Sequence, residues 1–433
     1  MAATGARGPS REVPDVVAPP PGHPRFPLSD GLRAIPALAI LFGHAWLFTN
    51  GFGGFTESIL NRAVVRLDGL FSLFFLLSAF LLYRPMIAHR AGGARAPRVS
   101  DYGVRRFLRI YPAYWVALTA LAILPGLFGV FSDKWFVFYG MFMYFDLGAT
   151  REVCPGIVSA VNPGIHCGLV QTWSVQVELT FYLALPFYAA LTGLLARGRD
   201  VKTWMKLELG VLALLAAVSL FLTGPPFDFK DEPWFVTSLV GHFYWFALGL
   251  AIAMLSVVYP KSNLPAALRF AANHPLALWI AAAGIYLATV LLFKYPIPFI
   301  LAPFTSAEYI SLVVLQGIGT ALLLLPAVFG NPNRGLVARI LTNPVLMWFG
   351  VISYGIALWH VVIMADLGLD GNASFLETFA IGSLITIPVA AISYYLIERP
   401  LMKFKYRSPR EVFRKWRQSR KASEPVADTG GSA

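Results

Sequence analysis

A few ionisable residues lie within long apolar segments of the sequence. His44 occurs in LFGHAWLF, Glu178 in TWSVQVELTFY, His242 in VGHFYWF and His360 in YGIALWHVVI. Ionisable side chains inside apolar spans are costly and are therefore candidates for function. A neutral imidazole can act as a general base near neutral pH, and a nearby carboxylate can orient it. We therefore predict that His44 and Glu178 are catalytic, with His44 as the base and Glu178 as its partner.

A second group of candidate residues is basic. Arg106 and Arg109 in RRFLRIYPAYW are three residues apart and share one helix face, whereas Arg105 lies on a different side. Arg33 precedes His44 by eleven residues, which is about 16 Å along a helix. Paired guanidiniums match phosphate geometry, although an ordinary basic flank of a membrane span has the same appearance. This spacing suits a phosphorylated donor such as acyl-CoA, bound at the arginines with its thioester reaching His44.

The composition indicates which elements position these residues. The chain has 433 residues, of which 57% are hydrophobic and 13% charged, with a mean hydropathy of +0.63. Soluble domains are about 25% charged, so a soluble enzyme, a disordered protein and a disulfide-rich module are excluded. Apolar runs of about 20 residues predict an all-α polytopic membrane protein, a bundle of about ten transmembrane helices. The predicted spans are 31–50, 67–86, 106–126, 172–195, 204–223, 234–258, 276–293, 308–329, 345–366 and 375–397.

The distribution of basic residues predicts the orientation. If the short apolar segment 134–147 does not cross, 29 of the 35 Lys and Arg residues fall on one side of the membrane. The positive-inside rule then places both termini in the cytoplasm and accounts for the net charge of +12 without nucleic acid. His44, Glu178, His242 and His360 all fall in the outer half, as a polar chamber open to the outside would require. A buried Glu178 also needs a partner, and a Glu–His pair would satisfy both groups.

The remaining regions are interpreted from composition. Residues 1–27 read as a disordered tail, 28–403 as the transmembrane domain and 404–433 as a basic cytoplasmic tail that contacts anionic lipid. Cys154 and Cys167 fall in one outer loop, where an oxidising environment favours a disulfide, with two free thiols as the alternative. No metal is expected, because His166 and Cys167 alone are too few ligands for zinc. The sequence has no phosphate-loop motif and no nucleophile elbow.

Six strings, taken in order, resemble the membrane acyltransferase 3 family across residues 25–403. They are FPLSDGLRAIPALAILFGHAW, FFLLSAFLLYRP, RRFLRIYPAYW, TWSVQVELTFYLALP, SYGIALWH and IERPL. The family comprises bacterial O-acyltransferases that acylate cell-envelope glycans, glycolipids or small molecules. The resemblance implies a ten-helix bundle in the bacterial cytoplasmic membrane and an acyl-CoA donor, with acetyl-CoA the leading candidate, used from the cytoplasmic side.

The resemblance also implies roles for individual residues. The family's essential histidine corresponds to His44, and its donor-associated arginines correspond to Arg106 and Arg109. The other positions that match its motifs are Arg33, Trp173, Ser174, Glu178, Tyr354, His360, Glu398 and Arg399. Two positions depart from the family pattern. Ala79 replaces a glycine, which is a packing change, and His242 stands where members often carry an arginine, so the acceptor could differ.

The expected function is transfer of an acyl group, acetyl above all, from acyl-CoA to a hydroxyl of an envelope glycan, glycolipid or lipid-linked sugar. Trp173, Ser174, His242, Tyr354 and His360 are expected to line the chamber or contact the acceptor. Whether His44 acts as a base or carries the acyl group is left open. Two alternatives remain: a tailoring acyltransferase for a small natural product, and a proton-coupled transporter or flippase that uses the buried His and Glu as a proton relay.

Overall fold

The structure is a computed structural model that describes residues 28–50, 58–92, 98–123, 169–224, 227, 235, 238–259, 261–295, 304–368 and 373–404. Within these ranges the regular structure is helical, with no strand. The predicted N-terminal tail, the basic tail from 405 onward, the segment 134–147 and both cysteines lie outside the described residues. The predicted disulfide between Cys154 and Cys167 therefore stays a prediction.

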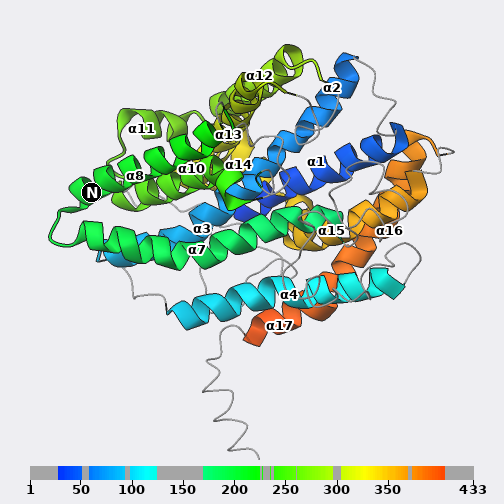
Figure 1. Cartoon of the computed structure of the whole chain (residues 1–433), viewed down its shortest axis with the longest axis horizontal. Coiled ribbons are helices and arrows are strands. Elements are labelled where there is room, and N and C mark those ends of the chain that lie inside the picture. The colour runs from blue at the N-terminus through cyan, green and yellow to red at the C-terminus, as the bar shows by residue number, and fades with distance from the viewer. Residues whose placement is uncertain are drawn as a thin grey trace, which may run out of the picture.

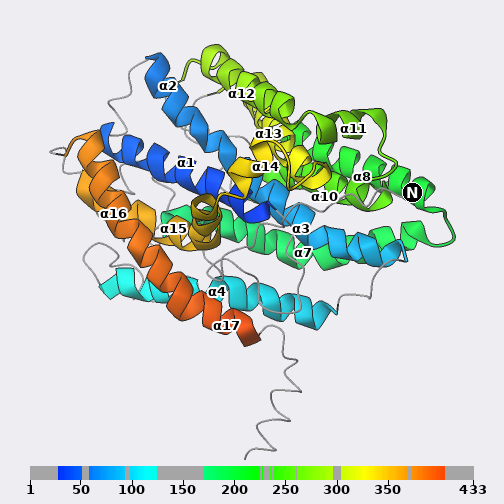
Figure 2. The same cartoon turned by 180° about the vertical axis from the view of Figure 1, so that it is seen from behind.

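Long helices run roughly side by side across the molecule (Figures 1 and 2). In chain order they are α1 (Ser29–Asn50), α2 (Ile59–Val65), η1 (Arg66–Phe71), α3 (Ser72–Arg90), α4 (Val99–Ile123), η3 (Val170–Thr172), α7 (Trp173–Ala196), α8 (Val201–Leu222), α10 (Leu239–Val258), α11 (Ala266–Asn273), α12 (Pro275–Leu292), α13 (Ser306–Phe329), α14 (Leu336–Leu341), α15 (Pro344–Gly368), α16 (Phe375–Ser393), η5 (Tyr394–Glu398) and α17 (Arg399–Phe404). η1 is a 3₁₀ helix, and η5 is a π-helical segment that connects α16 to α17.

Nine helical segments among the described residues are long and apolar enough to cross a membrane. They correspond to nine of the ten predicted spans, so the prediction of an all-α polytopic membrane protein is confirmed. The tenth predicted span, 106–126, corresponds to α4. The first half of α4 carries three arginines, so this helix is less apolar than the nine segments. One boundary prediction was wrong: the span expected at 67–86 is part of a helical segment from Ile59 to Arg90, so Arg62 and Arg66 are helical and not loop residues.

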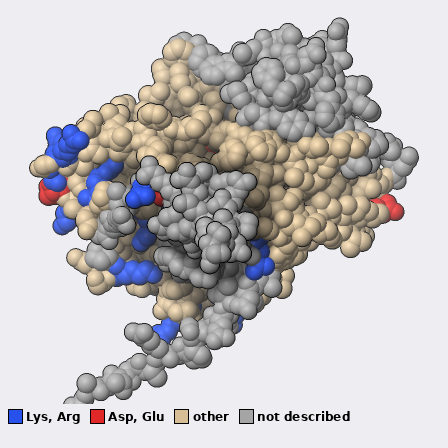
Figure 3. All heavy atoms as spheres, turned by 90° about the horizontal axis from the view of Figure 1, so that it is seen from below, with Lys and Arg blue, Asp and Glu red and all other residues tan. Residues whose placement is uncertain are grey.

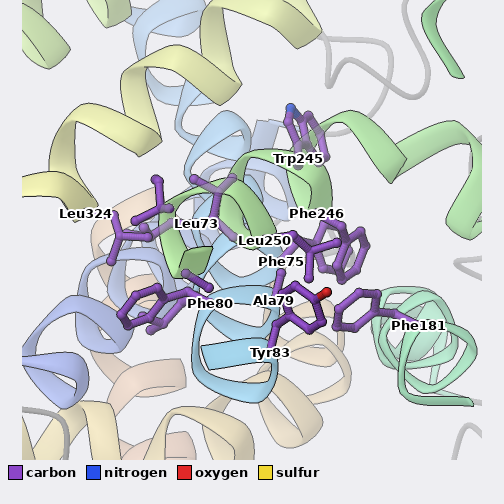
Figure 4. Packing of buried hydrophobic residues seen from close by; sticks show 14 of the residues in the cluster. Leu73, Phe75, Ala79, Phe80, Tyr83, Phe181, Trp245, Phe246, Leu250 and Leu324 are labelled. Atoms are coloured by element: carbon purple, nitrogen blue, oxygen red, sulfur yellow. The ribbon is translucent and has the colours of Figure 1, made fainter. Parts of the chain in front are cut away.

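The core is built around α3, which packs against α10, α13 and α7 (Figure 4). Phe75 stacks on Phe246 with ring centroids 4.8 Å apart, and Phe246 in turn stacks on Phe181 at 4.3 Å. Gly249 of α10 allows the closest approach, because a side chain there would meet the backbone of Leu76 and the methyl of Ala79. The close packing of α3 against α10 thus depends on two small residues at facing positions, Ala79 and Gly249.

A buried polar network joins the ends of α3, α7 and α8. Glu208 is 1% exposed and pairs with Arg90 at 2.5 Å. Tyr83 donates a hydrogen bond to the same carboxylate, and the guanidinium of Arg90 also donates to Thr192 at 3.0 Å. Every charge in this network has a partner, which a buried charge requires.

Basic side chains gather toward one end of the molecule. On the face seen in Figure 3 they lie toward the left, the end at which α7 turns into α8. This turn carries Arg197, Arg199 and Lys202. Asp200 caps α8 by accepting hydrogen bonds from the backbone N–H groups of Lys202 and Thr203. The hydroxyl of Thr203 also donates to its carboxylate, and this bond, together with the backbone bonds, lowers the pKa of the carboxyl.

Candidate active site

α1 lies against α15, which determines the partner of His44. A side chain at Gly350 of α15 would collide with the backbone carbonyl of Asp30, so the two helices approach closely near the start of α1. Further along, the Nδ1 atom of His44 lies 2.6 Å from the Nε2 atom of His360. The two rings stack with centroids 4.9 Å apart and planes inclined by 15°. Two of the predicted site residues, 316 positions apart in sequence, thus form a direct pair.

The second nitrogen of His360 determines the tautomers of this pair. Its Nδ1 atom lies 2.7 Å from the carbonyl oxygen of Ile356, and a carbonyl only accepts, so Nδ1 carries the proton. In a neutral ring Nε2 is then an acceptor, and His44 must donate to it from Nδ1. This leaves the lone pair of His44 on its own Nε2 atom. His360 is 1% exposed, so the two hydrogen bonds that fix this tautomer lie inside the protein.

A cavity of about 120 Å³ opens beside the histidine pair. A cavity of about 150 Å³ accommodates benzene, so the space suits a small organic group. Its walls come from α1, the α2–η1 segment, the η3–α7 junction and α15. The lining residues are Ala39, Ile40, Gly43, His44, Leu47, Val64, Val65, Asp68, Phe71, Gln171, Trp173, Ser174, Ala357 and His360. Four predicted site residues, His44, His360, Trp173 and Ser174, therefore meet at one cavity.

The three predicted arginines form a separate cluster near the N-terminal half of α1. Arg33 belongs to α1 itself, whereas Arg106 and Arg109 belong to α4. Arg33 lies close enough to Arg106 and Arg109 for their charges to interact. The guanidinium of Arg106 stacks on the ring of Tyr182 at 5.6 Å, and that of Arg109 lies over Tyr354 at 5.9 Å. Arg33 and Arg106 are partly exposed, as a group that receives a ligand must be. Because eleven residues are close to three helical turns, Arg33 and His44 lie on the same side of α1.

Glu178 belongs to the arginine cluster and not to the histidine pair. It accepts a hydrogen bond from Ser78 of α3, and its charge interacts with Arg33 and with Tyr182. The expected pairing of Glu178 with His44 was therefore wrong, because the imidazole of His44 is oriented by His360 instead. Equal depth in the membrane did not suffice, since Glu178 projects toward α3 and the arginines.

Arg109 has a carboxylate partner that comes from the π-helical segment. Its Nη1 atom lies 3.1 Å from Glu398, whose side chain is 1% exposed. Tyr354 donates a hydrogen bond to the carbonyl oxygen of Ile110 at 2.9 Å and supports the same corner of α4. Tyr354 thus lies with the arginines and is not among the residues that line the cavity, contrary to expectation. Arg105 turns away toward Asp101 at 3.9 Å, as its position on the helix predicted.

His242 lies behind the cavity wall. Its ring packs between Phe75 and Trp173, each with its centroid 5.5 Å away, and Trp245, at 5.0 Å. Its Nδ1 atom lies 3.1 Å from the carbonyl oxygen of Ser238, and Nε2 has no hydrogen-bond partner in the structure. His242 was expected to line the chamber, but Trp173 separates it from the cavity.

Two polar residues that line the cavity were missed from the sequence. Asp68 lies at the outer end of a predicted span, where an acidic residue is an available signal that was not used. Gln171 immediately precedes the predicted span 172–195 and gave no such signal. Its amide donates to the carbonyl oxygen of Leu358 at 2.5 Å, while its side-chain oxygen is buried without a hydrogen-bond partner.

The two clusters define a site with two chemically different ends. One end holds three guanidiniums, which bind phosphate or carboxylate groups. The other holds an oriented imidazole with a free lone pair beside a small cavity, which suits general-base or nucleophilic chemistry. Among the described residues, no group of His, Cys, Asp and Glu could hold a metal ion.

Comparison with known proteins identifies the family. The sequence profile of the acyltransferase domain of the acyltransferase 3 family matches residues 28–397, which is most of the chain. The chain therefore belongs to this family of acyltransferases and, with its many apolar helices, is a multi-pass membrane enzyme. No solved structure matches the chain.

Several relatives are similar over most of the chain. Nodulation protein 10 of Rhizobium leguminosarum bv. viciae is 27% identical over 87% of this chain and 93% of its own length. The peptidoglycan O-acetyltransferase OatA of Listeria monocytogenes and the putative peptidoglycan O-acetyltransferase YrhL of Bacillus subtilis are each 24% identical, over 87% and 90% of this chain. The chain spans little more than half of the length of these two acetyltransferases, 56% and 57%.

Proposed function

We propose that this protein transfers an acyl group, acetyl above all, from acyl-CoA to a hydroxyl group of a cell-envelope glycan, glycolipid or lipid-linked sugar. The observation that carries the proposal is the arrangement of Arg33 and His44 on one side of α1. One end of this helix contributes to a cluster of three arginines, and the other holds an imidazole oriented for proton transfer. Acyl-CoA has phosphates at one end and a thioester on a long arm at the other, which matches this separation.

In the proposed reaction His44 is the general base. Its Nε2 lone pair takes the proton of the acceptor hydroxyl while the oxygen attacks the thioester carbonyl carbon. The tetrahedral intermediate collapses, the carbon–sulfur bond breaks, and the imidazolium returns the proton to the leaving thiolate. The products are an ester and CoA with a free thiol. His360 keeps Nδ1 of His44 hydrogen-bonded throughout, so that Nε2 faces the reacting groups.

The proposal extends to topology and acceptor. With both termini in the cytoplasm of a bacterium, the arginine cluster is reached from the cytoplasmic side and the histidine cavity from the outer side. Two relatives named as peptidoglycan O-acetyltransferases support a polysaccharide hydroxyl as the acceptor. Glu178 stays a candidate site residue, now as the anion that balances the arginines and positions them for the donor.

The decisive experiment uses the full-length protein in membrane vesicles with radiolabelled acetyl-CoA. Wild-type vesicles are expected to release CoA and to label an added glycan acceptor. His44→Ala should abolish labelling while acetyl-CoA still binds, because the donor's phosphates are held at the arginines. Transfer by the His44→Ala variant at the wild-type rate would overturn the assignment of the base.

The donor site has a matched control on the same helix. Arg106→Ala and Arg109→Ala should each raise the KM for acetyl-CoA about tenfold or more, since each removes a charge-assisted contact to phosphate. Arg105→Ala removes the same charge from a neighbouring position of α4, where the guanidinium is paired with Asp101, and should leave this KM unchanged. Equal effects of the three substitutions would show that only the overall charge matters. If wild-type vesicles move a solute but release no CoA, the proton-coupled transporter is the better interpretation.

A further inference from the structure

The cavity beside His44 carries polar groups that the reaction described above does not use. Asp68 from η1 and Gln171 from η3 both line it, on segments that are far apart in sequence. Asp68 is a charged residue in a wall that is otherwise mainly apolar. A carboxylate in such a position is costly and is retained where it has a specific role.

Asp68 is held in place by neighbouring groups. The amide of Gln316 approaches a carboxylate oxygen of Asp68 at 3.5 Å, and Arg66 is close enough for the two charges to interact. Arg66 itself is 1% exposed, donates to the carbonyl oxygen of Tyr295 and is not among the lining residues. The positive charge thus stays behind the wall while the carboxylate borders the cavity.

In the side chain of Gln171 the amide nitrogen makes a hydrogen bond, whereas the oxygen makes none among the described residues. Its amide nitrogen is committed to the carbonyl oxygen of Leu358 at 2.5 Å, which fixes the side chain. The opposite oxygen, Oε1, is buried and has no hydrogen-bond partner among the residues that the structure describes. A buried amide oxygen with no partner loses a hydrogen bond that a ligand can restore.

The chemical character of these groups indicates what they recognise. The Asp68 carboxylate, Gln171 Oε1 and the free nitrogen of His44 are all hydrogen-bond acceptors. Acceptors bind donors such as hydroxyl groups and repel anions. An aromatic surface completes the wall, because Phe71 and Trp173 stack with centroids 5.2 Å apart and offer an apolar face to a ring.

We propose that Asp68 and Gln171 are specificity-determining residues that hold hydroxyl groups next to the reacting one on a neutral, polyhydroxylated acceptor. This inference rests on the proposed function and adds two residues and a charge preference to it. The acceptor fragment inside the cavity has hydroxyls adjacent to the acylated position and bears no carboxylate there. Asp68 and Gln171 accept hydrogen bonds from those hydroxyls, and the ring lies on Phe71 and Trp173.

The test measures acetyl transfer by the purified full-length protein in lipid nanodiscs, with labelled acetyl-CoA as donor. The two acceptors are a neutral hexose glycoside and the matching glycoside of the hexuronic acid. The wild type should prefer the neutral acceptor at least about tenfold in kcat/KM. Asp68→Asn should raise the KM for the neutral acceptor up to about tenfold, because a charge-assisted hydrogen bond becomes a weaker neutral one. It should also increase transfer to the uronic acid glycoside in absolute terms.

A gain on the anionic acceptor separates specificity from damage, since a misfolded variant loses both activities. Gln171→Leu should raise the acceptor KM without changing the preference between the two acceptors. Glu308→Gln removes the same charge at a partly exposed position in the first turn of α13 and is the matched control, with no effect on either acceptor. The KM for acetyl-CoA should be unchanged in all three variants.

The outcomes distinguish the inference from the function beneath it. If the wild type transfers acetyl groups but Asp68→Asn has the wild-type KM and the same preference, the inference is wrong and the proposed function stands. If the wild type transfers to neither acceptor nor to any hydroxyl compound, the proposed function itself fails. If Asp68→Asn does not fold, Asp68→Glu replaces it. This variant keeps the charge but displaces the carboxylate by one methylene group, so the acceptor KM should rise. An acceptor KM equal to that of the wild type would count against the inference.

Discussion

In the proposed reaction, the chemistry of His44 depends on His360. It accepts a hydrogen bond from Nδ1 of His44 and is itself fixed by the carbonyl oxygen of Ile356. His360→Leu removes the acceptor, so that His44 loses its preferred tautomer, and kcat should fall by about 10²–10⁴-fold. His360→Gln retains an oxygen that can accept from His44 and should recover part of the activity.

The readout for His360 is the rate of CoA release under saturating donor and acceptor, together with KM for acetyl-CoA. The KM should be unchanged in both variants, because the arginine cluster lies on the other half of α1. Equal activity of His360→Leu and wild type would show that His44 needs no partner, and an equal loss in both variants would argue for a role in packing only.

The site was partly predictable from the sequence at this scale. Depth along each helix brought His44 and His360 to the same level, and the spacing of Arg106 and Arg109 placed them together. Depth does not determine the direction of a side chain, which depends on helix packing. Glu178 was therefore assigned to His44 although it projects toward Ser78, and Asp68 was overlooked although it lies at the outer end of a predicted span, because its position near the end of the span made it look like an ordinary flanking charge.

At the scale of the elements, the packing of α3 against α10 depends on a close contact at Gly249, which has no side chain. A methyl group at Gly249 would lie 2.3 Å from the carbonyl oxygen of Leu76, and backbone cannot give way as a flexible side chain can. Gly249→Ala should therefore lower the stability by about 1–3 kcal/mol through overpacking. Gly284→Ala in α12 meets nothing within 4 Å and should be neutral or stabilising by up to about 1 kcal/mol.

The two glycine variants are compared by thermal unfolding in detergent, measured as the loss of soluble monomer with rising temperature. A lower Tm for Gly249→Ala with an unchanged or raised Tm for Gly284→Ala is expected. The predicted spans located both helices, but the packing partner of Ala79 could not be read from either segment alone. Similar Tm values for the two variants would mean that α3 and α10 separate without cost.

The ends of α3, α7 and α8 depend on one carboxylate. Glu208→Ala leaves Arg90 and Tyr83 without their shared partner, and an uncompensated buried charge costs about 3–5 kcal/mol. Asp200→Ala, at the exposed cap of the same helix, should lower the stability far less, because water can replace the lost capping bonds. The measurement is the yield of folded protein and its Tm in the same detergent. A loss for Asp200→Ala as large as that for Glu208→Ala would contradict the importance assigned to the buried network.

For the whole molecule, the proposed reaction requires that its two ends be reached from opposite sides of the membrane. Basic side chains gather toward one end (Figure 3), whereas α2, which contributes to the cavity wall, begins at Ile59, after a segment that the proposed topology puts outside (Figure 1). In this reaction the donor enters from one side of the membrane and the acceptor from the other, and they meet at the cavity beside His44. In the proposed reaction this separation matches the three turns of α1 that lie between Arg33 and His44.

Accessibility to a membrane-impermeant thiol reagent tests this arrangement. In a chain with Cys154 and Cys167 replaced by serine, Leu60→Cys at the exposed start of α2 should be labelled in intact cells. Gly103→Cys, at an open position near the start of α4, should be labelled only after the membrane is permeabilised. Labelling of both positions from outside would place the arginine end and the cavity on one side. In that case the donor and the acceptor would have to arrive from the same compartment, and the transmembrane transfer would be excluded.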